Sequence, residues 1–104
     1  MVDQEILEDA CLTLEQLCAA CALERDWLIR HVEEGLIPTS GASVAHGTSA
    51  VQTWRFTAAH LTRARRMRDI ERAYDAAPEL AALVADLLEE MDALRSRLQR
   101  ARPG

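Results

Sequence analysis

Three cysteines and one histidine near the start of the chain are the residues best suited to metal chemistry. Cys18 and Cys21 form a Cys-x-x-Cys pair, and Cys11 and His31 lie on either side of it. A structural zinc site usually takes four such ligands as two closely spaced pairs. Because the second pair is missing, the thiols are better explained as small core residues of a reduced protein, and no metal site is predicted.

Side chains that would suit catalysis do not occur in a recognisable arrangement. Gly41 and Gly47 are isolated, unlike the glycines of a phosphate-binding loop. No serine or cysteine has an evident histidine and carboxylate partner. His46 falls in a loop and His60 in the first turn of an expected helix. The sequence therefore predicts a protein that is not an enzyme and that needs no cofactor.

The elements that position these residues are expected to be mainly helices. Thr13 followed by Gln16 is a capping-box pattern, which predicts a first helix over about 14–20. A second helix is expected over about 25–34, where Gly35 supplies the residue that commonly ends a helix. These two helices together form a helix-turn-helix.

Two longer helices are expected in the second half of the chain. Thr57 is suited to cap a helix over about 58–75, whose apolar stripe is expected to include Tyr74. Its charged residues are spaced for local ion pairs, such as Arg68 with Glu71. Pro78 suits the first position of the last helix.

Between the helices lies a segment that predicts a small β wing. Residues 39–50 are mostly Thr, Ser, Gly and Ala, which is typical of a loop, and nothing in the sequence indicates what this loop does. Residues 51–56 have the pattern of a short strand, which is expected to pair with the chain near Ile37 as a hairpin.

Apolar residues in the last helix recur at alternating spacings of four and three, as in a coiled coil. Such a seam predicts a homodimer, with contact to the protein's own domain as the alternative. The candidate dimerisation residues are Leu80, Val84, Leu87, Met91, Leu94 and Leu98.

Charge is distributed unevenly along the 104 residues, whose net charge is −5. Residues 1–50 contain nine acidic residues and two arginines, whereas residues 51–104 contain ten arginines and eight acidic residues. The acidic half favours a basic partner and disfavours DNA, whose phosphates it repels. The acidic N-terminal segment lacks the pattern of a targeting signal, and no apolar segment is long enough to span a membrane, so a cytoplasmic location is expected.

The order of these elements resembles that of MerR-type domains, which the segments 14–18 and 27–38 resemble most closely. The expected fold is therefore mainly α, a MerR-like winged helix-turn-helix with a small β wing and a C-terminal coiled-coil-like helix. One domain is expected over 1–104, with the winged helix-turn-helix part at 12–76 and the dimerisation helix at 78–101.

Several positions depart from the DNA-binding branch of that family. Ala22 replaces the glycine of the turn, and Glu24 replaces the usual serine cap. Ile29 and Arg30 stand in place of an arginine-tyrosine pair, and Trp54 stands where the wing has an arginine. Each departure removes a phosphate contact or adds negative charge near one.

The same departures make the chain resemble the CbpM-type chaperone modulators. The similarity rests on Thr53-Trp54-Arg55-Phe56, on the arginine-rich segment 63–68 and on the helix that follows Pro78. It implies binding to the J-domain of a DnaJ-like co-chaperone of the curved-DNA-binding type. It also implies inhibition of that co-chaperone's stimulation of Hsp70, and of its attachment to DNA.

An acidic surface with an apolar residue beside it is what a basic J-domain face requires. The candidate J-domain contacts are Asp26, Trp27, Glu33 and Glu34 in the second helix and Asp86, Glu89 and Glu90 in the fourth. The sequence does not choose between the two sets. The alternative functions are a MerR-like DNA-binding transcriptional regulator and a small-molecule sensor, of which the second has no specific support.

Overall fold

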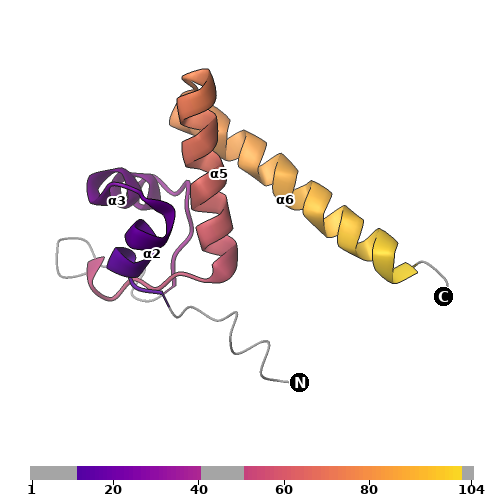
Figure 1. The fold of residues 1–104 in the computed structure, drawn as a ribbon, viewed down its shortest axis with the longest axis horizontal. Coiled ribbons are helices and arrows are strands. Elements are labelled where there is room, and N and C mark those ends of the chain that lie inside the picture. Colours follow the sequence, from indigo (N-terminus) through magenta and orange to yellow (C-terminus); the bar gives the residue numbers. More distant parts are fainter. Residues whose placement is uncertain (1–11, 41–50, 102–104) are drawn as a thin grey trace.

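Four helices make up the part of the protein that the computed structural model describes, residues 12–40 and 51–101 (Figure 1). In chain order they are α2 (Leu14–Cys21), α3 (Arg25–Glu33), α5 (Ala58–Tyr74) and α6 (Pro78–Ala101). The predictions made for Cys11, His46, Gly41 and Gly47 fall outside the described residues.

Helix α2 begins with the predicted capping box. The backbone N–H of Gln16 donates to Oγ1 of Thr13 at 3.1 Å, and the backbone N–H of Thr13 donates to Oε1 of Gln16 at 2.9 Å. The helix buries Leu14 and Leu17 and ends at Ala22, which adopts a left-handed conformation with φ 54°. Alanine therefore occupies the conformation that glycine would adopt more easily.

Helix α3 follows after a short turn and completes the helix-turn-helix. Its N-cap residue is Glu24, whose side chain makes no capping hydrogen bond. Leu28 and His31 are its buried residues. Gly35, with φ 80°, takes the predicted position just beyond the end of the helix, where a side chain would be strained.

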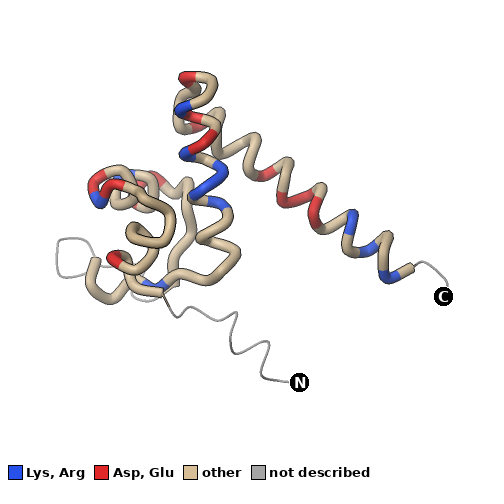
Figure 2. Tube along the Cα trace, viewed as in Figure 1, with Lys and Arg blue, Asp and Glu red and all other residues tan. Residues whose placement is uncertain are grey.

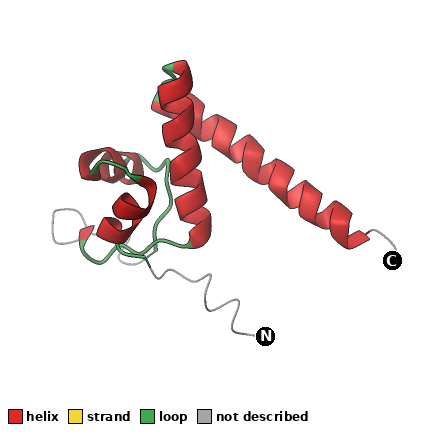
Figure 3. Ribbon diagram, in the orientation of Figure 1, coloured by secondary structure: helices red, strands yellow, loops and turns green. Residues whose placement is uncertain are grey.

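The predicted β wing was not observed as a hairpin. In the two described ranges the extended pairing consists of isolated antiparallel bridges, Ser40 with Arg55 and Leu12 with Phe56 (Figure 3). The strand expected over 51–56 is shortened because Val51 is helical and residues 52–53 form a turn. The guanidinium of Arg55 stabilises this turn by donating to the carbonyl oxygens of Gln52 and Trp54.

Helix α5 is the central element, and a capping box also begins it. The backbone N–H of His60 donates to Oγ1 of Thr57, and the backbone N–H of Thr57 donates to Nδ1 of His60, both at 3.1 Å. Histidine thus does what glutamate or glutamine does in the usual motif. Asp75, in a left-handed conformation, caps the C-terminal end.

Helices α2 and α3 lie on one side of α5, and α6 turns back along the other and then extends clear of the domain (Figure 1). Three alanines of α6, Ala81, Ala82 and Ala85, are buried. Small residues let two helices approach closely, so α6 packs on α5 through its alanines and leaves its leucines free. Tyr74, expected in the apolar stripe of α5, is instead 77% exposed, because the core ends one turn earlier.

Candidate protein-binding surfaces

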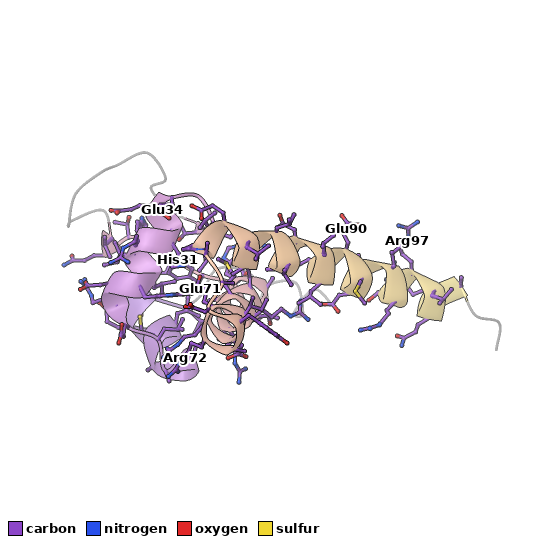
Figure 4. The ribbon with its side chains drawn as sticks, turned by 90° about the horizontal axis from the view of Figure 1, so that it is seen from above. His31, Glu34, Glu71, Arg72, Glu90 and Arg97 are labelled. Carbon is purple, nitrogen blue, oxygen red and sulfur yellow. The ribbon has the colours of Figure 1, made fainter. Side chains whose placement is uncertain are left out.

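A cluster of three side chains joins α3 to α5. Nε2 of His31 lies 2.7 Å from Oε2 of Glu71, and Nε1 of Trp27 donates to Oε1 of the same carboxylate at 2.9 Å. The rings of Trp27 and His31 stack with centroids 3.8 Å apart. Figure 4 shows His31 and Glu71 directed toward each other. The Glu71 carboxylate therefore holds two aromatic side chains of α3 against α5.

Trp27 also lines a cavity of ≈ 530 Å³ at the N-terminal end of α3 and the C-terminal end of α5. Three carboxylates line the same cavity, those of Glu24, Glu71 and Asp75, together with the guanidiniums of Arg68 and Arg72. Asp26, which is next to Trp27 in the sequence, does not line it. Trp27 therefore lies in a hollow lined by both negative and positive side chains.

The other predicted contacts of α3 are solvent-facing. Asp26, Glu33 and Glu34 are all exposed, and none forms an ion pair with another described residue. Arg25, which pairs with Glu15, and Arg30 are the exposed arginines of α3, where Figure 2 shows charges of both signs. Apart from the Arg25–Glu15 pair, the outer face of α3 thus has three carboxylates against one guanidinium, so phosphate would be repelled there and a basic surface attracted.

Two of the three predicted contacts of α6, Asp86 and Glu89, bind a buried arginine of α5, whereas the third, Glu90, is exposed. The guanidinium of Arg63 donates to Oδ1 of Asp86 at 2.8 Å and to Oε2 of Glu89 at 2.9 Å. Its Nε–H donates to the carbonyl oxygen of Leu36, also at 2.8 Å. The side chain of Arg63 is only 10% exposed, so this one residue connects α5, α6 and the segment that leaves α3.

Electrostatics at this junction favour a charged arginine and a neutral histidine. Burial by itself lowers the pKa of Arg63, but its hydrogen bonds to Glu89 and Asp86 outweigh burial, and the pKa is raised overall. Burial lowers the pKa of His60 nearby, against a smaller opposite effect of Glu89. The neutral His60 ring is also what its cap requires, since Nδ1 accepts a hydrogen bond there.

The coiled-coil seam is exposed along α6. Its large side chains Leu80, Leu87, Met91, Leu94 and Leu98 are 45–68% exposed, and Val84 is partly buried. Glu90 and Arg97 point from the same side of the helix (Figure 4). Acidic residues lie in the first half of α6 and arginines near its end (Figure 2). The seam therefore faces away from the protein's own domain and is available to another chain.

The two described thiols are not arranged as metal ligands. Within residues 12–40 and 51–101, no group of His, Cys, Asp and Glu is placed to hold a metal ion. Burial raises the pKa of Cys18, and nearby Glu15 adds to this effect. Burial also raises the pKa of Cys21. Both thiols are therefore protonated near neutral pH and are weak ligands and nucleophiles.

A comparison with protein families agrees with this helix-turn-helix arrangement. The profile of the MerR HTH family of regulatory proteins matches residues 12–102. The chain belongs to this family. Searches of curated proteins and of solved structures gave no match.

Membership of the MerR family places the protein among regulators and accounts for the order of α2, α3, α5 and α6. None of the described helices is long and apolar enough to cross a membrane. Sequence reasoning located the helix-turn-helix of this MerR-family chain but missed Glu71 and Arg63, whose partners lie 40–44 and 23–27 residues away.

Proposed function

We propose that this MerR-family protein regulates by binding another protein, the J-domain of a DnaJ-like co-chaperone of the curved-DNA-binding type. Binding inhibits the stimulation of Hsp70 by competing for the same basic J-domain face, with no chemical step. The resemblance of segments 53–56, 63–68 and 78–98 to the CbpM-type modulators supports this choice of partner.

The main support for this proposal is the negative charge on the outer face of α3. In a helix-turn-helix that reads DNA, this is the helix that enters the major groove, where positive charge is favoured. Here the face presents Asp26, Glu33 and Glu34 against Arg30, Glu24 precedes the helix, and Arg25 is paired with Glu15 of α2. Such a face is suited to a basic protein surface, since complementary charges steer association and fix orientation.

We also propose that the active form is a homodimer joined through the seam of α6. Five of the six apolar residues in coiled-coil spacing are exposed and would otherwise stay in contact with water. The acidic first half and the arginine-rich end of α6 favour an antiparallel pair, in which opposite charges face each other.

A DNA-binding regulator is the second candidate, and the MerR family match favours it. Arg65 and Arg72 of α5 are exposed and provide positive charge. The two candidate functions predict opposite results in two assays. The modulator saturates a purified J-domain and suppresses the ATPase activity that this J-domain induces in Hsp70. The DNA-binding regulator shifts a specific DNA fragment and leaves that ATPase activity unchanged.

A further inference from the structure

A small groove of ≈ 260 Å³ lies where α6 passes the start of α5 and the segment that leaves α3. Leu36, Pro38 and Ala59 give it an apolar lining. Asp86 and Glu89 of α6 give it a charged edge, and the side chains of His60 and Arg63 also line it. The groove therefore combines an apolar lining with carboxylates, as a site for a long basic side chain does.

Arg63 leaves half of each carboxylate available. Its guanidinium donates to Oδ1 of Asp86 and to Oε2 of Glu89. Among the described residues, the second oxygen of each carboxylate accepts no hydrogen bond. The two acidic side chains are 60% and 48% exposed. One guanidinium against two carboxylates leaves an excess of one negative charge, and Arg63 fixes where that charge lies.

Building on the proposed function, we infer that this groove receives an arginine or lysine side chain of the J-domain. The methylene part of that side chain packs on Leu36, Pro38 and Ala59, and its cationic end binds the free oxygens of Asp86 and Glu89. Arg63 acts as the positioning residue, because it holds both carboxylates at the edge of the groove.

The acids of α3 do not offer the same arrangement. Asp26, Glu33 and Glu34 line neither this groove nor the larger cavity beside Trp27. They lie on an open helix face, where an ion pair is largely screened by water. We therefore assign them a role in steering the partner, and we place the residues that hold it around the groove.

A matched pair of substitutions tests the assignment. Ala59→Arg fills the groove with the protein's own cation, whereas Ala58→Arg adds the same charge one residue earlier, outside the groove. Both alanines are exposed in the first turn of α5, so both variants are expected to fold. Calorimetric titration with the purified J-domain is expected to show at least tenfold weaker binding for Ala59→Arg and less than a twofold change for Ala58→Arg.

A second pair removes charge instead of adding it. Asp86→Asn is expected to weaken J-domain binding at least tenfold, whereas Glu90→Gln, on the same helix but outside the groove, changes it less than threefold. Equal effects of Ala59→Arg and Ala58→Arg would overturn the assignment. A larger loss from the combined Glu33→Gln and Glu34→Gln variant would also overturn it, in favour of α3. If the unaltered protein does not bind, the proposed function itself fails, and the groove assignment fails with it.

Discussion

The imidazole Nε2 of His31 in α3 lies 2.7 Å from the carboxylate Oε2 of Glu71 in α5, and this contact fixes the helix-turn-helix to the central helix. The other ring nitrogen of His31 lies 2.8 Å from the carbonyl oxygen of Trp27. The side chain of His31 is 2% exposed and that of Glu71 is 15% exposed, so water does not readily replace either partner.

Removing the carboxylate is expected to destabilise the fold. Glu71→Ala leaves the ring nitrogen of His31 and the indole N–H of Trp27 without an acceptor, which costs about 2–3 kcal/mol in the free energy of unfolding. Asp69→Ala, at an exposed position of the same helix, is expected to change it by at most about 0.5 kcal/mol. Urea unfolding of both variants measures the difference, and equal losses would contradict a structural role for Glu71.

The Arg63 junction is expected to be the more important of two arginine contacts between α5 and α6. Arg63→Met leaves the carbonyl oxygen of Leu36 unpaired and removes the cation between two carboxylates. The free energy of unfolding is expected to fall by about 2 kcal/mol. Among the described residues Arg66 has one ion-pair partner, Asp92 at 2.9 Å, and is more exposed than Arg63, so Arg66→Met is expected to lower the free energy of unfolding by at most about 1 kcal/mol. Thermal unfolding distinguishes the two, and the reverse order would show that the junction is misassigned.

His60 gives the protein a defined pH dependence. Because burial lowers its pKa in the folded state, the unfolded chain takes up a proton first as the pH falls. The free energy of unfolding therefore decreases as the pH drops through about 6.5, the ordinary pKa of histidine. The decrease ends once the pH is below the pKa of His60 in the folded state.

The matched variant for this pH dependence is His60→Gln, which keeps a capping-box residue but cannot titrate. The difference in unfolding midpoint between the two proteins, followed from pH 8 to pH 5, isolates the contribution of His60. The parent protein is expected to lose stability relative to the variant over this range. A constant difference would contradict a cap that depends on neutral histidine.

The seam of α6 predicts self-association that a single substitution can disrupt. Leu94 is 55% exposed and lies beyond the alanines that pack on α5, so Leu94→Arg leaves the monomer intact. It is expected to raise the dissociation constant of the dimer at least tenfold. Ala93→Arg adds the same charge beside the seam and is expected to have little effect. Sedimentation of the parent protein and the two variants measures the dissociation constant of the dimer. A monomeric parent protein would contradict the proposed dimer.

Local sequence patterns were enough to predict each helix of the described residues to within one or two residues. Thr13, Thr57, Gly35 and Pro78 act on their immediate neighbours, so their effects can be predicted from spacing alone. His60 as a capping residue could have been found in the same way, since it stands three residues after Thr57.

The remaining features depend on contacts between distant residues. Arg68 and Glu71 are spaced for a local ion pair, yet Glu71 binds Trp27 and His31, and Arg68 donates to the carbonyl oxygen of Ala22. The burial of Arg63 could not be predicted from the sequence either, because its partners come from α6 and from the segment after α3. The charge of a residue is evident in the sequence, but the partner that neutralises it appears only when the helices pack.

The proposed binding is measured by calorimetric titration of the intact protein with the purified J-domain of the curved-DNA-binding type of co-chaperone, at low and at physiological salt. The proposed function predicts saturable binding that weakens as salt rises, because acidic residues of this protein meet a basic face. Absence of binding at micromolar concentrations in both buffers would contradict the proposed function, and a specific DNA shift by the same protein would then favour the DNA-binding regulator.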